Sequence, residues 1–211
     1  MKNTIFILFW CLLGLTTNAQ KSINFTLQLT FEYIKDGKKT EFSVFVEPKT
    51  STWLLTKDDT FLGKPDDINY WILTPDGRIT IISNDEQGKT KRIVVNNPLA
   101  KKFSATIVGK KTSKTKIFGQ NQYGWKTLRG EEYILTAGRA NEKMYLSKMP
   151  FNCHPLIAYN SCLDIENPLP AFYQLEYPNF LPKNYLVVEE TSTQVRLVSV
   201  SPTEYFIDLS K

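Results

Sequence analysis

Apolar and polar residues alternate without a break from residue 23 to residue 33, in the stretch INFTLQLTFEY. The apolar positions share one side of an extended chain, and they are Ile23, Phe25, Leu27, Leu29, Phe31 and Tyr33. A period of two over this length predicts a β-strand with one buried and one solvated face. Asp36-Gly37 follows and indicates a hairpin turn, because both central positions of such a turn favour positive φ. Residues 40–47 are then the returning strand.

The same arrangement recurs at residues 70–83, where Asp76-Gly77 separates two β-rich arms. If those two residues form the whole loop, Ile72 lies opposite Ile81 and Thr74 lies opposite Ile79. We therefore expect a second hairpin with that register.

Further β-rich runs are separated by polar or glycine-containing turns. They cover residues 84–95, 103–109, 123–128, 132–137, 143–147, 185–190, 194–200 and 204–210. Ten or more short strands in meander order predict an all-β protein with a curved or closed antiparallel sheet. Few short helices are expected, and residues 98–105, with Pro98 in the first turn, are one candidate. The basic cluster at residues 110–116 is interpreted as a solvated turn beside a strand.

Residues 150–182 differ from the rest of the chain. They hold six of the eleven prolines and many aromatic residues. Proline removes a backbone donor, so this cannot be a run of central strands. The aromatic content argues against a solvated linker. We interpret the segment as an ordered Pro/aromatic excursion that packs on the sheet.

The first residues have the layout of a secretory signal peptide. Lys2 precedes an apolar run at residues 5–15, and small residues lead to Ala19. The apolar run is shorter than the roughly 20 residues that span a bilayer. We expect cleavage after Ala19, which leaves residues 20–211 as a single β-rich domain. The protein is then exported, to the periplasm or outside the cell.

The formal net charge of the chain is +5. A mild positive excess is consistent with solubility and with peripheral contact with anionic lipid or glycan of the envelope. Nucleic acid is a poor partner for an exported protein. The sequence does not determine an oligomeric state.

The residues most often used in catalysis and metal binding gather at residues 151–162, which hold Cys153, the one histidine His154, and Cys162. A structural zinc site takes four such ligands, so no metal is expected. Two cysteines this close in an exported chain favour a Cys153–Cys162 disulfide, which would stabilise the excursion. No nucleophile motif or phosphate loop is present, and no cofactor is expected. Carboxylates paired only in space, as in a glycosidase, leave no signal in the sequence and stay open.

Residues 40–150 resemble uncharacterised Gram-negative exported proteins related to the LolA-like lipoprotein-carrier superfamily. The resemblance lies in FSVFVEPKTSTWLL, in INYWILTPDGRITIISNDEQGKTKRIVV, and in TLRGEEYILTAGRANEKMYLSK, whose RGEEYIL and KMYLSK take the places of two hairpin arms in those families. It implies an unclosed, strongly curved antiparallel half-barrel with an apolar concave face that binds lipid acyl chains. It carries over no catalytic residue.

We therefore expect a non-enzymatic binding protein that holds a hydrophobic, lipid-like ligand or a lipidated partner protein on the concave face. The candidate lining comes from the first strand, and the candidate lid from the excursion. The lining is Phe25, Leu27, Leu29 and Phe31, and the lid is Phe172, Tyr173, Tyr177 and Phe180. The alternatives are a cell-envelope interaction module for protein or glycan, favoured by a filled core with exposed edge strands, and a hydrolase with paired carboxylates, favoured by a cleft that holds them.

Overall fold

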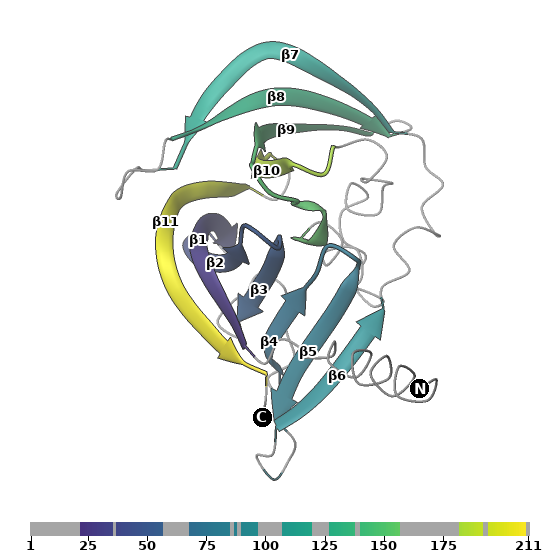
Figure 1. Ribbon diagram of the computed structural model, residues 1–211. Coiled ribbons are helices and arrows are strands. Elements are labelled where there is room, and N and C mark those ends of the chain that lie inside the picture. The colour runs from purple at the N-terminus through teal and green to yellow at the C-terminus, as the bar shows by residue number, and fades with distance from the viewer. Residues whose placement is uncertain are drawn as a thin grey trace, which may run out of the picture.

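The computed structural model describes residues 22–35, 37–56, 68–84, 87, 90–96, 107–119, 127–137, 140–156, 182–191 and 194–209. The helical backbone in these ranges is confined to residues 154–156. These ranges contain eleven β-strands (Figure 1). They are β1 (Ser22–Lys35), β2 (Lys38–Glu47), β3 (Thr52–Thr56), β4 (Ile68–Leu73), β5 (Arg78–Asn84), β6 (Thr90–Asn96), β7 (Ile107–Phe118), β8 (Leu128–Ala137), β9 (Ala140–Lys148), β10 (Tyr185–Glu190) and β11 (Val195–Asp208).

All eleven strands belong to one antiparallel sheet, in the order β6-β5-β4-β3-β2-β1-β11-β10-β9-β8-β7. The first and last strands of the chain pair with each other, and a meander runs outward from each of them. The sheet is curved and unclosed, which confirms the predicted all-β class and open half-barrel. β6 and β7 follow one another in the chain but form the two opposite edges. No helix in the described ranges has the length and apolar character needed to cross a membrane.

β11 is a long arc that curves around β1 and β2 (Figure 1). Its pairing with β1 shifts register twice, between Phe25 and Leu27 and between Thr30 and Phe31. Pro202 lies at the first shift, where its missing N–H interrupts the ladder. The sequence predicted separate strands at residues 194–200 and 204–210; the structure joins them into one bent strand.

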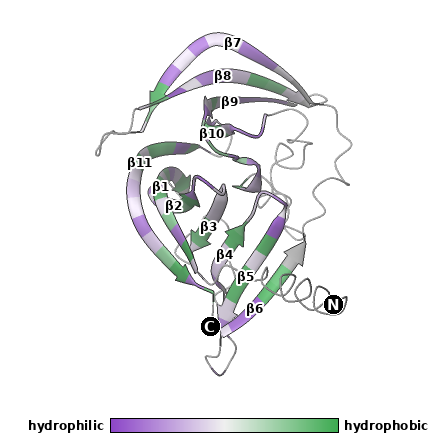
Figure 2. Cartoon of the chain, in the orientation of Figure 1, coloured by the Kyte–Doolittle hydropathy of each residue, from purple (hydrophilic) through white to green (hydrophobic). Residues whose placement is uncertain are grey.

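The strands around β3 bury both of their faces. A first core and a second core lie on opposite sides of β2–β5. Figure 2 shows hydrophobic, green bands along these strands. The first core contains, among others, Leu27, Leu29, Phe31, Val44, Val46, Trp53, Leu55, Trp71 and Leu73. The second core contains Ile23, Phe25, Phe45, Leu54, Ile72, Ile82 and Ile207. The alternation predicted for residues 23–33 is confirmed in β1, where the apolar positions are buried and the polar positions between them are exposed or partly exposed.

The two Asp-Gly turns behave differently. The first closes a two-residue loop, since Lys35 pairs with Lys38 as predicted. At the second, Ile72 lies opposite Thr80 and Ile81 lies opposite Trp71, so the predicted register is wrong by one residue. The Gly77 amide donates to the Thr74 carbonyl over 3.0 Å, and Gly77 has a φ of 82°. Pro75 presets the first central position of this longer turn, and the left-handed glycine ends it.

The strands β7–β11 form a separately curved part of the sheet, which we call the second curl. β7 is separated from β11 by three strands, yet the two strands are in contact. Gly130 on β8 makes this curvature tight, because its missing side chain leaves room for Phe118 of β7 and Val188 of β10 to meet above it. The basic cluster at residues 110–116 lies within β7 and is not a turn, contrary to prediction.

The two ends of the Pro/aromatic excursion pair with each other. The Met149 amide donates to the Asn184 carbonyl over 2.8 Å, and the Cys153 amide donates to the Lys183 carbonyl over 2.6 Å. The indole nitrogen of Trp53 donates to the Asn152 carbonyl over 2.9 Å. The excursion therefore leaves and rejoins the fold beside β3. The candidate helix at 98–105, the signal segment at 1–19 and residues 157–181 lie outside the described residues.

Candidate functional site

The four residues predicted to line a ligand cavity are all buried. Phe25 packs in the second core, whereas Leu27, Leu29 and Phe31 pack in the first. Although they alternate on one strand, the residues on either side of the β1–β11 register shift at residues 25–27 pack in different cores. The four side chains are therefore part of the two packed cores. The predicted lid residues, Phe172, Tyr173, Tyr177 and Phe180, lie outside the described residues.

Cys153 carries a free thiol that is fully buried in the first core. Its Sγ lies 3.7 Å from the Phe151 carbonyl oxygen. The Cys153–Cys162 disulfide predicted from spacing and compartment is therefore not formed at Cys153 in this structure, and Cys162 lies outside the described residues. Burial raises the pKa of the Cys153 thiol far above its usual range, so the group behaves as a small apolar side chain.

A row of polar side chains crosses the sheet at right angles to the strands. Glu32 pairs directly with Arg196, Arg196 with Glu189, Glu189 with Tyr145, and Tyr145 with Glu132. Directly opposite residues point to the same side and lie side by side. We call this set the polar row. It links β1, β11, β10, β9 and β8, and its charged members alternate in sign from Glu32 to Glu189.

Lysines on other strands compensate the carboxylates of the polar row. Lys116 reaches from β7 across the second curl and forms an ion pair with Glu189. Its ammonium also lies 5.3 Å from the ring centroid of Phe118 and 5.7 Å from that of Tyr145, within cation–π range. At the other end, Lys39 Nζ lies 3.6 Å from Glu32 Oε2. The row therefore connects the second curl to the centre of the sheet.

Glu132 is the most buried carboxylate of the row. Thr112 Oγ1 donates to its Oε1 over 2.9 Å, and Tyr145 Oη donates to its Oε2 over 3.1 Å. Burial alone would raise the pKa of Glu132, but these two hydrogen bonds, with the charges of Lys114 and Lys143, outweigh burial and lower it. Burial raises the pKa of Tyr145, and its bond to the Glu132 carboxylate raises it further. This cluster is a satisfied network that anchors β7 to β8 and β9.

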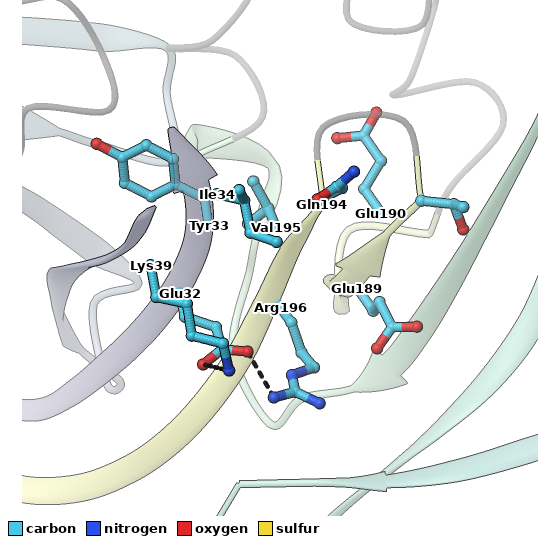
Figure 3. A pocket seen from close by; sticks show the side chains of 10 residues that line it. Glu32, Tyr33, Ile34, Lys39, Glu189, Glu190, Gln194, Val195 and Arg196 are labelled. Carbon is cyan, nitrogen blue, oxygen red and sulfur yellow. Dashed lines mark hydrogen bonds and ion pairs between the residues drawn. The ribbon is translucent and has the colours of Figure 1, made fainter. Parts of the chain in front are cut away.

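An open pocket of about 230 Å³ lies between two hairpin ends (Figure 3). The ladder between β1 and β11 ends at the Glu32–Arg196 pair, and beyond it the β1–β2 and β10–β11 hairpins separate. The Glu32–Arg196 pair forms the floor, with Arg196 Nη2 2.5 Å from Glu32 Oε1. We call this space the fork pocket. It is lined by Glu32, Tyr33, Ile34, Lys39, Glu189, Glu190, Thr191, Gln194, Val195 and Arg196.

The walls of the fork pocket differ in character. On the β1–β2 side, Ile34 is 47% exposed and Lys39 extends over Glu32. On the β10–β11 side, Gln194 has a φ of 55°, a left-handed conformation that lets the chain turn into β11. Glu190 is almost fully buried, so it presents little surface to the pocket. The pocket thus has an apolar side, an amide and an ion-paired floor.

The fork pocket brings carboxylates together, but Glu32 and Glu189 are each held by a cation. A glycosidase-type general acid requires a carboxyl group that is protonated at the working pH, and an ion-paired carboxylate is poorly suited to that role. No group of three His, Cys, Asp or Glu side chains suited to a metal ion occurs in the described ranges. The exposed donors and acceptors of the fork pocket can form hydrogen bonds to a bound molecule.

The two edges of the sheet are built differently. β7 carries a bulge in which residues 112–114 lie opposite Glu132 alone, and lysines 110, 111 and 114 are exposed along it. Bulges and lysines are devices that prevent an edge from pairing with another strand. β6 pairs regularly with β5 over seven residues. Its Ile93 is 39% exposed and its Val94 49% exposed.

Sequence reasoning missed the polar row, the fork pocket and the position of β6 at an edge of the described sheet. The members of the row lie between residues 32 and 196, and only the strand register brings them into line. A local signal did exist for the edge, because KRIVV places two cations directly before adjacent apolar residues. Natural sequences place charged residues beside apolar strands that could otherwise pair with other chains.

Comparisons with known proteins say little about function. No protein family and no curated protein matches the chain. A solved structure titled "Structure of PNGF-II in C2 space group" is similar to it with a TM-score of 0.44 and 14% sequence identity. The match covers 89% of this chain and 29% of that chain, so this chain spans less than a third of its length. The resemblance to lipoprotein carriers stays a prediction.

Proposed function

We propose that this chain is a non-enzymatic interaction module of the cell envelope that binds a partner protein by adding one of its strands to β6. The proposal includes export, as the first residues predict. The observation that carries it is the contrast between the two edges of the sheet: a bulge at residues 112–114 interrupts the ladder of β7, whereas β6 pairs regularly and exposes the adjacent apolar side chains Ile93 and Val94.

Both cores reach β5, the strand that pairs with β6. Ile93 pairs with Ile81, which packs against the first core, and Val94 pairs with Thr80 on the side of the second core. An added strand would continue both cores. Complete burial of an aliphatic side chain is worth about 1.5–3 kcal/mol, so covering the exposed parts of these two residues contributes about 1 kcal/mol each. The remaining affinity comes from the new backbone ladder.

The charges on β6 indicate the composition of the partner strand. Lys91 and Arg92 are exposed at the start of β6. Opposite charges on directly facing residues stabilise a strand pair, and like charges destabilise it. We infer a partner strand with aliphatic residues opposite Ile93 and Val94 and acidic residues opposite the two cations.

The alternative hypothesis of a hydrophobic ligand requires a hollow interior. Its predicted lining from β1 is packed into two cores, with Leu27 and Leu29 fully buried. This packing supports an interaction module in preference to a lipid carrier.

Photo-crosslinking tests the proposal. We would place benzoylphenylalanine at Val94 in cells of the source organism and at Ile117, an exposed position on β7, as the matched control. We expect an adduct with another protein at position 94 and none at position 117. Ile93→Lys should abolish the adduct while thermal unfolding changes little, because exposed substitutions usually shift stability by about 0.5 kcal/mol or less.

Equal labelling at both edges, or no adduct at position 94, would contradict the proposal. An adduct with twice the mass of the chain would show that the partner is a second copy of this chain and not another protein.

A further inference from the structure

The fork pocket is a second candidate binding site, far along the sheet order from β6 and independent of it. We propose that it binds one neutral pyranose ring, as part of a glycan. The proposal depends on three features of the pocket: the charge balance of its floor, its exposed hydrogen-bonding groups, and its apolar side.

The floor of the pocket disfavours ionic ligands of either sign. Arg196 lies directly between Glu32 and Glu189 in the strand register. Lys39 lies over Glu32, and Lys116 pairs with Glu189. An incoming anion would therefore meet two carboxylates, and an incoming cation would meet Arg196 and Lys39. Unfavourable charge contacts of this kind discriminate against wrong ligands.

The same groups suit hydroxyls, which donate and accept hydrogen bonds at the same time. The side chain of Arg196 is 42% exposed, and in the described structure its Nη2 bonds to Glu32. The other guanidinium donors of Arg196 can serve a ligand, since a guanidinium carries five N–H groups. The Glu32 oxygens offer acceptors beside these donors, and the exposed Gln194 amide offers both. Neighbouring hydroxyls on a sugar ring match this alternation.

The apolar side of the pocket suits the C–H face of a sugar ring. Ile34 is half-exposed at the tip of β1, and Val195 at the start of β11 also lines the pocket. Figure 3 shows both side chains above the Glu32–Arg196 pair. The volume of about 230 Å³ is below the 300–1,000 Å³ of pockets for drug-sized ligands, so one ring rather than a longer segment fits inside.

A titration followed by NMR tests this inference. The probes are the methyl glycosides of glucose, galactose, mannose and N-acetylglucosamine, with galacturonate as an anionic and glucosamine as a cationic counterpart. We expect at least one neutral glycoside to shift the backbone amide signals of Ile34, Gln194 and Val195, with a dissociation constant of about 1 mM. The charged sugars should shift them less.

Variants at exposed positions separate binding from folding. Ile34→Ala and Gln194→Gly should each weaken binding about fivefold, since losing about 1 kcal/mol of contact changes the dissociation constant by that factor. Gln194→Gly also suits the left-handed φ at that position, so the fold is retained. Phe206→Ala is the matched control, because Phe206 is another exposed apolar residue, 64% exposed, that lies outside the pocket. It should bind as the wild type does.

The inference fails if none of the four neutral glycosides shifts these signals. It also fails if galacturonate or glucosamine binds more tightly than every neutral sugar, since the pocket would then be an ion site. Neither result affects the proposal for β6, which is tested by crosslinking at another edge of the sheet.

Discussion

Gly130→Ala tests how tightly the second curl is closed. A Cβ at Gly130 would lie 2.5 Å from Phe118 Cε2, 3.0 Å from Phe118 Cδ2 and 3.1 Å from Val188 Cγ2. Carbon atoms pack best at about 3.5–4.0 Å, so the phenyl ring would have to move by about 1 Å. Phe118 is buried, with its centroid 5.6 Å from that of Tyr145 and the Lys116 ammonium above it. The ring therefore has little space to move into.

The size of the effect follows from two opposing contributions. Overpacking of a filled core costs about 1–3 kcal/mol. Replacing glycine by alanine where the backbone allows it stabilises by about 0.4–1 kcal/mol, because the unfolded chain loses freedom. We expect a net loss of about 1–2 kcal/mol in the free energy of unfolding. For a chain of this length, that lowers the melting temperature by about 2–8 °C.

Thermal and urea unfolding, followed by circular dichroism, measure this change. Phe118→Leu removes the ring atoms that clash, so the double variant Gly130→Ala, Phe118→Leu should be more stable than the sum of the two single effects predicts. A positive coupling of this kind is expected only for residues in contact. If Gly130→Ala is as stable as the wild type or more stable, the close approach of β7 to β10 over Gly130 is refuted.

Three other predictions concern the cores and the polar row. Leu29→Ala should lower the free energy of unfolding by about 2–5 kcal/mol with an unchanged urea m-value, because it leaves a cavity in the first core; a loss below about 1 kcal/mol would mean that this site is not packed. The pKa of Glu132 is lowered from 4.5, so its stabilising contribution is complete above that pH and is lost as the pH falls through the lower folded-state value. Glu132→Gln should therefore be less stable than the wild type at neutral pH, with a difference that shrinks in acid; a difference independent of pH would contradict the ionised network. Cys153 should resist alkylation by iodoacetamide in the native protein and react in urea, as peptide mass spectrometry can measure, and rapid native labelling would place its thiol outside the core.

Local patterns decided the class of the fold and many of its strands. The alternation at residues 23–33 and the Asp36-Gly37 turn predicted β1, β2 and their hairpin, because a period of two and a two-residue turn are properties of neighbouring residues. The turn at Pro75 was the exception, because its loop is one residue longer than predicted. The longer loop moves the register of β4 and β5 by one residue.

Contacts between distant residues decided the rest. Nothing near residue 25 or residue 205 shows that the first and last strands pair, yet that pairing makes β6 and β7 the edges. Burial of both faces at β3, the free thiol of Cys153 in the first core, and the alignment of Glu32, Arg196 and Glu189 all follow from it or from the curvature of the sheet. The sequence by itself determined most of the strand segments, though not β3 or the middle of β7, because that choice depends largely on local periodicity. Only the tertiary structure decided which strands are neighbours and which side chains meet, because pairing over long chain separations is set by how all the buried surfaces pack together.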